Sequence, residues 1–428
     1  MKKYNVLILG SGAREHAFAL KISASPILNA LFVAPGNAGT SEIAKNLDIS
    51  DGDFDSIKMA VITNQIDLVV VGPEGPLVAG IVDFFRQDEK LKTVLIIGPD
   101  ATASQLEGSK DFAKKFMTKY NIPTAKWQSF TKDTINSGYE FLESLAPPYV
   151  LKASGLASGK GVLIIDDLQT AKSKLSEMLG GMFGGASDTV VIEEFLQGIE
   201  LSVFVLTDGN SYKILPTAKD YKRIYNRDQG PNTGGMGSVS PVPFADSEFM
   251  KLVDKTIIAP TFWGILDEGL NYCGFIFIGL MNCGGVPKVI EYNCRMGDPE
   301  TQSVFSRIES DLLEHLVATA KQVLYYEDIK ISNQSAVTVV LASGGYPGEF
   351  TKGHQITIGD TAENINIFHG GAKTQGDKII TNGGRVLSVT AIGDTIKDAK
   401  EKSYSQIKSI NFKDMYFRED ISDDIVNI

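Results

Sequence analysis

The sequence predicts a multidomain protein that combines an N-terminal α/β domain with later α+β units, and three observations predict it. The chain has 428 residues, nearly three times the ~150 residues of one domain, so two to four hydrophobic cores are expected. The first hundred residues alternate short apolar runs with helical patterns, which is typical of a doubly wound parallel sheet. In the rest of the chain, strand patterns, longer helical patterns and glycine-rich turns follow one another in a way that is typical of α+β domains.

Composition and charge narrow the class of protein. Hydrophobic residues make up 43% and charged residues 22% of the chain, which is typical of soluble globular proteins and not of disordered or fibrous ones. The net charge of −11 argues against nucleic acid as the main partner, although a locally basic cleft can still bind small anions. No apolar run approaches the ~18 residues of a membrane helix, so no membrane partner is expected. Three cysteines without C-x-x-C spacing predict neither disulfides nor a zinc site, and favour a reducing cytoplasm.

The N-terminal domain is expected over residues 1–103. Its predicted strands are Val6–Leu9, Leu31–Val33, Asp67–Val71 and Val94–Ile97, and its predicted helices are Arg14–Ser23 and Pro76–Arg86. Ligands of such sheets bind beyond the carboxyl ends of the strands. The loops at those ends, Gly10–Glu15, Pro35–Thr40 and Gly72–Glu74, should therefore converge on one crevice.

The loop after the first strand carries Gly10-x-Gly12, which in a dinucleotide site brings phosphate oxygens to helix N-terminal amides. The third glycine of that motif is missing because residue 15 is Glu, and no acid ends the second strand. NAD binding is therefore the weakest interpretation. A phosphate or sugar-phosphate site with Arg14 as a cation is favoured, and a simple tight turn is the alternative.

A helix at Ser104–Tyr120 is expected to lead into a compact α+β unit over residues 122–193. Its predicted elements are strands Tyr149–Ala153, Val162–Ile165 and Val190–Glu194, a helix at Leu168–Leu179 and a loop at Gly180–Gly185. Lys152-Ala-Ser-Gly-Leu-Ala-Ser-Gly-Lys-Gly161 joins the first two strands. Only three residues separate Gly155 from Gly159, and no Ser or Thr follows Lys160, so this is not a Walker motif. We expect a flap over phosphates, with Lys160 and Lys152 as donors; a flexible hairpin is the alternative.

The segment Glu193-Glu-Phe-Leu196 leads into the next unit. It can serve as an adenine-binding linker, but from the residues alone an ordinary strand end is favoured. The further elements expected up to residue 328 are strands Leu201–Thr207, Tyr212–Pro216, Phe275–Met281 and Val289–Asn293, and helices Glu248–Leu270 and Ser310–Leu324. A last unit from residue 329 should contain strands Ala336–Ala342 and Val386–Ile392 and a helix at Ile396–Ser409.

The segment Val289–Glu300 is the most informative. Strand alternation places Glu291, Asn293 and Arg295 on one face. A carboxylate and a carboxamide suit Mg²⁺ or Mn²⁺ on nucleotide phosphates, and a guanidinium can neutralise a transferring phosphoryl group. A solvated sheet face is the alternative. The glycine-rich loop 230–237, preceded by Lys219-Asp-Tyr-Lys-Arg223, adds a cationic segment that can clamp a substrate.

Several long motifs together resemble the phosphoribosylamine–glycine ligases, also called glycinamide ribonucleotide synthetases, of the ATP-grasp superfamily. The motifs are Gly10-Ser-Gly-Ala-Arg-Glu-His16, Gly108-Ser-Lys110, Lys152–Gly161, Glu193-Glu-Phe195, Gly230-Pro-Asn-Thr-Gly-Gly-Met-Gly237, Arg295-Met-Gly-Asp-Pro-Glu-Thr-Gln302, Gly344-Gly-Tyr-Pro-Gly348 and Thr381-Asn-Gly-Gly-Arg-Val-Leu387. They follow the family's order over essentially the whole chain. Tyr221, Met296 and Gly75 depart from the family's usual His, Phe and Ala, but none of them removes a charge.

The resemblance implies an ATP-grasp fold with a central domain (104–121 and 194–328), a mobile lid (122–193) and a small C-terminal α+β domain (329–428). It also implies ligation of glycine to 5-phosphoribosylamine through a glycyl phosphate, by a monomer that uses ATP with Mg²⁺ or Mn²⁺. The residues it implies are Lys110, Lys152, Gly159, Lys160, Glu193, Phe195 and Glu200 for ATP, Glu291 and Asn293 for the metal, Arg295 and Asp220 for catalysis, and Gly10, Gly12, Arg14, Glu15, Gly235 and Arg295 for substrates. Another ATP-grasp ligase, an NAD-dependent oxidoreductase and a non-catalytic nucleotide-binding protein are the competing interpretations.

Overall fold

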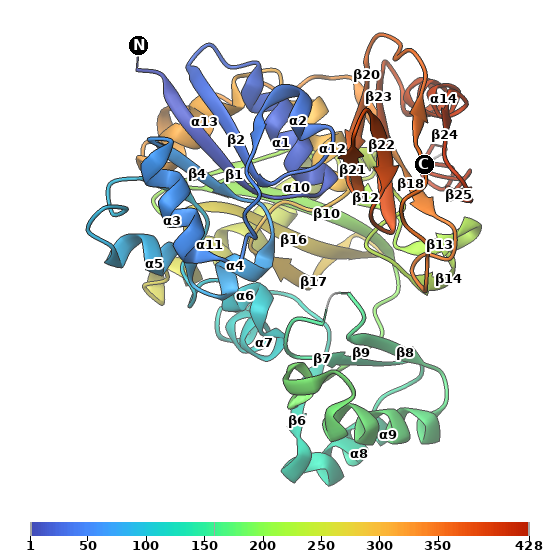
Figure 1. Cartoon of the computed structure of the whole chain (residues 1–428). Coiled ribbons are helices and arrows are strands. Elements are labelled where there is room, and N and C mark those ends of the chain that lie inside the picture. The colour runs from blue at the N-terminus through green and yellow to red at the C-terminus, as the bar shows by residue number, and fades with distance from the viewer. Residues whose placement is uncertain (1, 158, 427–428) are drawn as a thin grey trace.

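The computed structural model describes residues 2–157 and 159–426. Figure 1 shows an N-terminal sheet and a C-terminal sheet side by side, a central sheet beneath them, and a small unit, residues 122–193, that projects from this body. Among the described residues no helix is long and apolar enough to cross a membrane.

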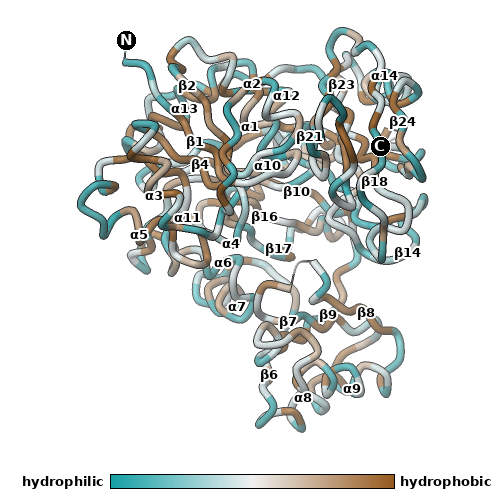
Figure 2. Tube along the Cα trace, viewed as in Figure 1, coloured by the Kyte–Doolittle hydropathy of each residue, from teal (hydrophilic) through white to brown (hydrophobic). Residues whose placement is uncertain are grey.

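The N-terminal sheet is entirely parallel, with the order β3-β2-β1-β4-β5, which confirms the predicted doubly wound sheet. Its strands are β1 (Tyr4–Gly10), β2 (Leu28–Pro35), β3 (Lys45–Asn46), β4 (Leu68–Val71) and β5 (Leu95–Ile97). Its helices are α1 (Ala13–Ser23), α2 (Thr40–Ile43), α3 (Phe54–Thr63), α4 (Glu74–Val78) and α5 (Ile81–Gln87). Strand β4 and residues Val6–Leu9 of β1 are apolar and buried because both sheet faces are covered (Figure 2). The single helix predicted at Pro76–Arg86 is wrong: it divides into α4 and α5 because Gly80 takes a left-handed φ of 86°.

Residues 105–119 form two helices, α6 (Gln105–Gly108) and α7 (Lys110–Lys119), in place of the one predicted. The break falls at Ser109, whose backbone is extended and whose hydroxyl accepts a hydrogen bond from the Phe112 N–H. Ser109 is therefore an N-cap, and it begins α7 at Lys110.

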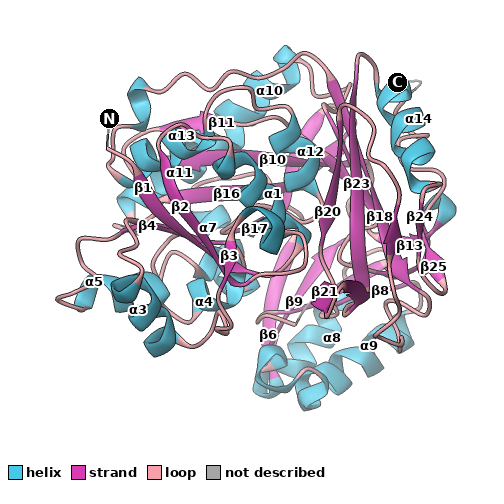
Figure 3. Ribbon diagram, turned by 45° about the horizontal axis from the view of Figure 1, so that its top comes forward, coloured by secondary structure: helices cyan, strands magenta, loops and turns pink. Residues whose placement is uncertain are grey.

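The 122–193 unit is an antiparallel sheet in the order β6-β9-β7-β8, packed against two helices (Figure 3). Its elements are β6 (Trp127–Thr131), α8 (Ile135–Glu143), β7 (Tyr149–Ala153), β8 (Val162–Ile165), α9 (Leu168–Glu177) and β9 (Thr189–Glu194). Phe130, Leu151 and Leu175 belong to a hydrophobic core of its own. The segment Gly180–Gly185, predicted as a loop, instead forms parts of two short helical turns, Met178–Met182 and Gly184–Ser187. Gly181, inside the first turn, takes a left-handed φ of 101°.

The central sheet is antiparallel, in the order β11-β10-β16-β17. It contains β10 (Ile199–Thr207), β11 (Tyr212–Ile214), β16 (Gly274–Cys283) and β17 (Val286–Asn293). The helices of this part are α10 (Ser247–Val253), α11 (Ala259–Asp267), α12 (Glu300–Ser306) and α13 (Leu312–Ala320). One wider helical turn, Asp254–Ile258, joins α10 to α11, so the long helix predicted there is nearly continuous.

The C-terminal sheet has the order β12-β15-β18-β23-β20, with β25 (Met415–Tyr416) beside β18. Its strands are β12 (Lys219–Asp220), β15 (Gly237–Ser240), β18 (Ser335–Ser343), β20 (Ile365–His369) and β23 (Arg385–Gly393), and α14 (Ile396–Ile407) packs on it. Short pairs complete the molecule: β13 (Arg223–Tyr225) with β14 (Gln229–Asn232), β19 (Thr357–Ile358) with β24 (Ile410–Asn411), and β21 (Ala372–Gln375) with β22 (Lys378–Thr381). Because β12 and β15 come from the middle of the chain, the central and C-terminal parts are interleaved.

The N-terminal sheet and the central part share one hydrophobic core. Phe18 of α1 packs edge-on against Phe305 of α12, with ring centroids 4.7 Å apart, and against Phe275 of β16. Val6 and Ile8 of β1 belong to the same buried cluster. This packing brings the loop after β1 to the turn that follows β17, where the predicted site residues lie.

Candidate active site

Arg295 lies at the end of β17, between two carboxylates from the N-terminal half. Its Nη2 is 2.6 Å from Glu107 Oε1, and its Nε is 3.2 Å from Glu74 Oε2. Nη2 also donates to Asn293 Oδ1 at 3.1 Å. The structure thus brings the predicted amide and guanidinium together, and these contacts fix the guanidinium in place.

The two carboxylates keep Arg295 charged. Burial opposes the charge, but Glu107 and Glu74 outweigh it and raise the pKa of Arg295. Burial raises the pKa of Glu107, although Arg295 works against that rise. Glu107 also accepts hydrogen bonds from the Cys294 N–H at 2.8 Å and the Cys294 Sγ at 3.1 Å. Nothing in the sequence marks Glu107 as a site residue, because it lies outside the motifs and 188 residues from Arg295.

A second buried group links the 122–193 unit to the central sheet. Glu193 lies between two lysines, with Oε1 2.9 Å from Lys152 Nζ and Oε2 2.9 Å from Lys114 Nζ. Lys152 also donates to the Ile290 carbonyl of β17 at 3.3 Å. Burial lowers the pKa of Lys114 to about 8, although Glu193 works to raise it. Lys114 carries no motif, and the sequence analysis missed it.

This geometry changes the role expected for Glu193. The resemblance places Glu193 with Phe195 and Glu200 at adenine and ribose. Its carboxylate is buried and held by two lysines, so its side chain positions Lys152. Phe195 is exposed just beyond β9, and Glu200 Oε2 is 2.7 Å from Lys222 Nζ.

Glu291 stands among cations from several elements. Burial works to raise its pKa, but Lys222, Lys152, Lys110 and Arg295 together lower it, so the carboxylate is ionised. Nearby, burial raises the pKa of Asp220 against the opposing effect of Lys222. Burial also lowers the pKa of Lys110, with Glu291 opposing. The predicted residues Lys110, Lys152, Asp220, Glu291 and Arg295 therefore form one electrostatic cluster.

The Glu291 and Asn293 side chains fit a hard divalent cation by the chemistry of their donors, a carboxylate and an amide oxygen. Among the described residues no group of three or more His, Cys, Asp or Glu side chains has the arrangement of a metal site. The protein thus offers few ligands here, which suits a cation that phosphate oxygens and water also bind.

The flap between β7 and β8 is exposed at its tip. Gly159 takes a left-handed φ of 75°, and Lys160 lies at the surface. Gly155 is packed against the turn at residues 184–187, where a Cβ would lie 2.8 Å from the Ala186 Cα. The base of the flap is therefore fixed, whereas its tip projects.

The loop after β1 is built around Glu15. Its Oε2 accepts the Gly12 N–H at 2.6 Å, and its Oε1 lies 2.6 Å from Arg14 Nε. Gly10, at φ 119°, is needed because any side chain there would meet Glu15. Since Glu15 is only 2% exposed, it supports the loop, and the direct substrate contact implied by the resemblance does not follow from this geometry.

Two further contacts connect this loop with the turn that carries Arg295. Arg14 Nη1 donates to the Met296 carbonyl at 3.1 Å, and Arg295 Nη1 donates to the same carbonyl at 3.3 Å. Gly235, at φ 111°, lies against Pro299, where a Cβ would be 2.4 Å from the proline Cδ. The loops 10–15 and 230–237 therefore meet at residues 296–299.

A small antiparallel unit next to a larger antiparallel sheet, with lysines of the small unit and of helix α7 around a carboxylate, defines a protein of the ATP-grasp class. Models of the phosphoribosylglycinamide synthetase N domain, ATP-grasp (A) domain and C domain match residues 4–107, 108–301 and 336–424. The chain belongs to the phosphoribosylglycinamide synthetase family, which confirms the resemblance seen in the sequence.

Relatives of similar length support this membership. The phosphoribosylamine–glycine ligase of Vibrio cholerae is 43% identical over 422 residues, which cover 97% of both chains. That of Escherichia coli K12 is 42% identical over 424 residues, with the same coverage. The crystal structure of phosphoribosylamine–glycine ligase from Thermotoga maritima is 35% identical, with a TM-score of 0.84 over 97% of this chain and 100% of that one. The biotin carboxylase domain of Hydrogenobacter thermophilus 2-oxoglutarate carboxylase, 15% identical with a TM-score of 0.74, shares the fold.

Proposed function

We propose that this protein joins glycine to 5-phosphoribosylamine with hydrolysis of ATP to ADP and phosphate, giving glycinamide ribonucleotide in the second step of de novo purine synthesis. The observation that carries the proposal is Arg295, held by Glu74 and Glu107 beside Asn293, in a chain of this family. The charges of Lys222, Lys152, Lys110 and Arg295 keep the pKa of Glu291 low.

The residues suit a reaction that needs positioning more than a protein nucleophile. The glycine carboxylate attacks the γ-phosphorus, and ADP leaves. The amine nitrogen of phosphoribosylamine then attacks the carbonyl carbon of the glycyl phosphate, and phosphate leaves while the nitrogen loses a proton. Arg295, held by Glu74 and Glu107, neutralises the charge of the phosphoryl and acyl phosphate groups.

The ATP contacts come from helix α7, the small unit and the central sheet. Lys110 of α7 and Lys152 of β7 would bind the phosphates, and Gly159 and Lys160 of the flap would cover them. Phe195 and Glu200 would contact adenine and ribose. Glu291 and Asn293 would hold Mg²⁺ or Mn²⁺, which supplies positive charge to the phosphates.

The remaining residues serve the other substrates. Asp220 lies half-buried near Lys222 and would be available to the glycine ammonium or to the reacting amine. Arg14, Gly12 and Gly235 would line the site of the phosphoribosyl group. We expect the enzyme to act as a cytoplasmic monomer.

The test is ADP release with each substrate omitted in turn, combined with identification of the product. The proposal requires ADP release that depends on both glycine and phosphoribosylamine, with one glycinamide ribonucleotide formed per ADP. ADP release with a different carboxylate and amine, but not with this pair, would assign the protein to another ATP-grasp ligation.

A further inference from the structure

Strand β12 and the two residues after it present one face to the candidate site and the other to residues 417–426, the C-terminal segment. Asp220 and Lys222 lie on the face of the site, where the Lys222 charge is near the Asp220 carboxyl. Because side chains alternate along an extended backbone, Lys219 and Tyr221 point the opposite way. Both contact the C-terminal segment, to which no role has been given above.

Tyr221 is buried, and the C-terminal segment binds its hydroxyl as both donor and acceptor. The hydroxyl donates to Asp424 Oδ1 at 2.6 Å and accepts the Ser422 N–H at 3.0 Å. Burial and the Asp424 charge raise the pKa of Tyr221, so the hydroxyl keeps the proton that it donates. Lys219 Nζ lies 2.8 Å from Asp424 Oδ2 and 3.8 Å from the centroid of the Tyr221 ring. Lys219 and Tyr221 are therefore anchored to the same carboxylate.

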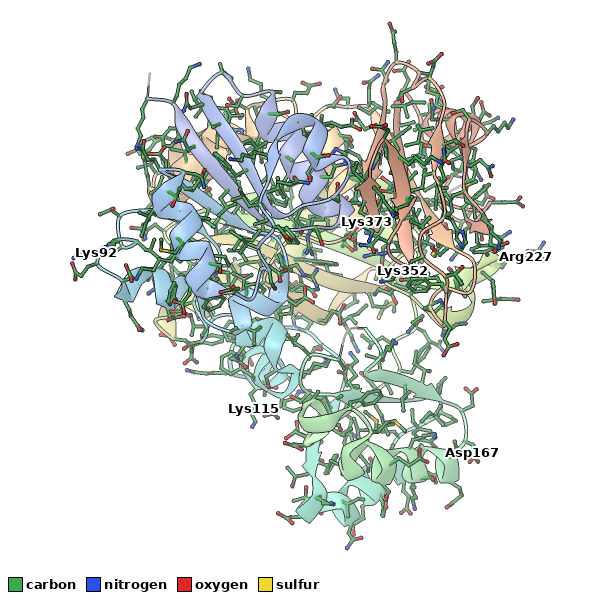
Figure 4. The ribbon with its side chains drawn as sticks, in the orientation of Figure 1. Lys92, Lys115, Asp167, Arg227, Lys352 and Lys373 are labelled. Carbon is green, nitrogen blue, oxygen red and sulfur yellow. The ribbon has the colours of Figure 1, made fainter. Side chains whose placement is uncertain are left out.

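A buried arginine fixes the start of the C-terminal segment. Arg418 donates to both carboxylate oxygens of Asp420, at 2.8 and 2.9 Å, and to Asp228 Oδ1 at 2.7 Å. Its guanidinium carbon is 5.1 Å from the centroid of the Tyr221 ring. The backbone N–H of Arg227, a residue labelled in Figure 4, donates to Asp420 Oδ2 at 2.6 Å. The C-terminal segment is thus attached to the chain after β12 at two places, Tyr221 and residues 227–228.

The backbone around Tyr221 connects this anchor to Asp220. Asp220 pairs with Ser238 of β15. The Tyr221 N–H donates to the Gly237 carbonyl at 3.1 Å, and the Tyr221 carbonyl accepts the Met236 N–H at 2.8 Å. A shift of the Tyr221 ring would therefore move the backbone of β12, and the Asp220 carboxyl with it.

Lys222 has an anchor of its own. Its carbonyl accepts hydrogen bonds from the N–H and the hydroxyl of Thr233, each at 2.8 Å. Its Nζ is 2.7 Å from Glu200 Oε2. Loss of the Tyr221 contact should therefore disturb Asp220 and leave Lys222 and Glu200 in place.

We propose that the C-terminal segment positions Asp220 through Tyr221, a positioning residue whose side chain faces away from the site. The segment anchors the Tyr221 hydroxyl, the anchored ring fixes the backbone of β12, and this backbone directs the Asp220 carboxyl into the site. The inference rests on the proposed function, in which Asp220 binds the glycine ammonium or the reacting amine.

The test compares Tyr221→Phe with Tyr225→Phe in the full chain. Each change removes one phenolic hydroxyl, but Tyr225 is exposed and packs edge-on against Tyr416, so it is the matched control. Asp220→Asn first identifies the substrate, glycine or phosphoribosylamine, whose KM depends on Asp220. We expect Tyr221→Phe to raise the KM for that same substrate about fivefold and to change the KM for ATP less than twofold. Tyr225→Phe should change each KM less than twofold.

Two further variants separate positioning from a loss of stability. Asp424→Ala removes the acceptor on the half-exposed side of the contact and should raise the same KM as Tyr221→Phe does. Adding Tyr221→Phe to Asp220→Asn should raise that KM no further, because the tyrosine acts through the carboxylate. A partly unfolded protein would instead lose kcat while its KM values stayed unchanged.

No KM dependence on Asp220, an unchanged KM in Tyr221→Phe, equal shifts in Tyr221→Phe and Tyr225→Phe, or a further rise in the double variant would overturn the proposal. Amide exchange of residues 219–222 separates it from the proposed function, since we expect Tyr221→Phe to speed that exchange. Faster exchange in this variant, in a protein without glycine-dependent ADP release, would refute the proposed function and leave the anchoring of β12 standing.

Discussion

Arg295 shows at the residue scale how two carboxylates fix a guanidinium, which in the proposed reaction neutralises phosphate charge. We expect Arg295→Ala to lower the rate of glycine-dependent ADP release on the order of 10²-fold or more, as for other preorganised charge stabilisers. Arg295→Lys should retain part of the activity, because it keeps the charge but cannot reach Glu74 and Glu107 together as the guanidinium does. Near-normal turnover of the alanine variant, with its fold verified by circular dichroism, would refute the role.

Lys114 is a buried lysine that acts through Glu193 on Lys152. Lys114→Met should lower the free energy of unfolding by about 3–5 kcal/mol, because Glu193 loses one of its two buried partners. It should also raise the KM for ATP, since Lys152 is then held less firmly. The control is Lys115→Met on the same helix, labelled in Figure 4, whose side chain is 69% exposed and pairs with Asp111 at the surface.

Urea unfolding and ATP titration of the two variants measure these effects. Equal stability and equal KM for ATP in Lys114→Met and Lys115→Met would show that the Lys114–Glu193–Lys152 arrangement has no positioning role.

The sequence identified the residues that carry motifs, such as Lys152, Glu291 and Arg295, but not the residues that hold them. Lys114 and Glu107 look like ordinary helix residues, because a buried ion pair leaves no periodic signal in the sequence. Their partners are distant along the chain, and Arg295 and Glu107 are 188 residues apart. Only tertiary packing reveals them.

At the scale of elements, the polar residues within α12 and β6 explain why the sequence did not predict these two elements. Helix α12 (Glu300–Ser306) was not predicted, because its buried residues include Glu300, Thr301, Gln302 and Ser303, which do not resemble a core helix. Strand β6 (Trp127–Thr131) has only Phe130 fully buried, and it showed no apolar run. By contrast, β7 is apolar except for Lys152, and its predicted bounds, Tyr149–Ala153, are those of the structure.

The contact between α1 and β20 predicts a pH dependence of stability. The His369 backbone N–H donates to His16 Nδ1 at 2.9 Å, and burial lowers the pKa of His16 to about 3 and of His369 to about 4. Below pH 6.5 these histidines become protonated in the unfolded chain, whereas in the folded protein they stay neutral until about pH 4 or lower. The free energy of unfolding therefore includes the full contribution of the neutral histidines above pH 6.5. As the pH decreases below 6.5, this contribution decreases by up to about 1.4 kcal/mol per pH unit for each histidine.

The measurement is the free energy of unfolding between pH 6.5 and pH 4.5 for the parent and His16→Gln, which keeps an acceptor for the His369 N–H. We expect the variant to have a shallower slope, by up to about 1.4 kcal/mol per pH unit. Identical slopes would show that His16 does not contribute to the acid sensitivity of this contact.

At the scale of the whole molecule, the parallel N-terminal sheet follows from local patterns, but the C-terminal sheet does not. Strands β12 and β15 lie more than ninety residues before β18 in the chain, yet they complete its sheet. Such pairing is decided by the packing of the assembled domains, and short strands like Lys219–Asp220 carry no signal of it. Periodicity predicted separate α+β units, and the resemblance assigned residues 194–328 to the central domain, so neither predicted that β12 and β15 join the C-terminal sheet.

The 122–193 unit has a hydrophobic core of its own, and its polar links to the body lie at its base, among them Lys114 to Glu193 and the Lys110 N–H to the Ser154 carbonyl, each at 2.9 Å. We therefore predict that it moves as a lid, open to admit ATP and closed to exclude water during transfer. ATP with Mg²⁺ should slow both protease cleavage within the unit and amide exchange in its edge strand β8, because closure covers that strand. Helix α14, remote from the lid in Figure 1, should exchange equally in both states and is the internal control. Equal cleavage and equal β8 exchange with and without nucleotide would mean that the unit is fixed, and that ATP enters by another route.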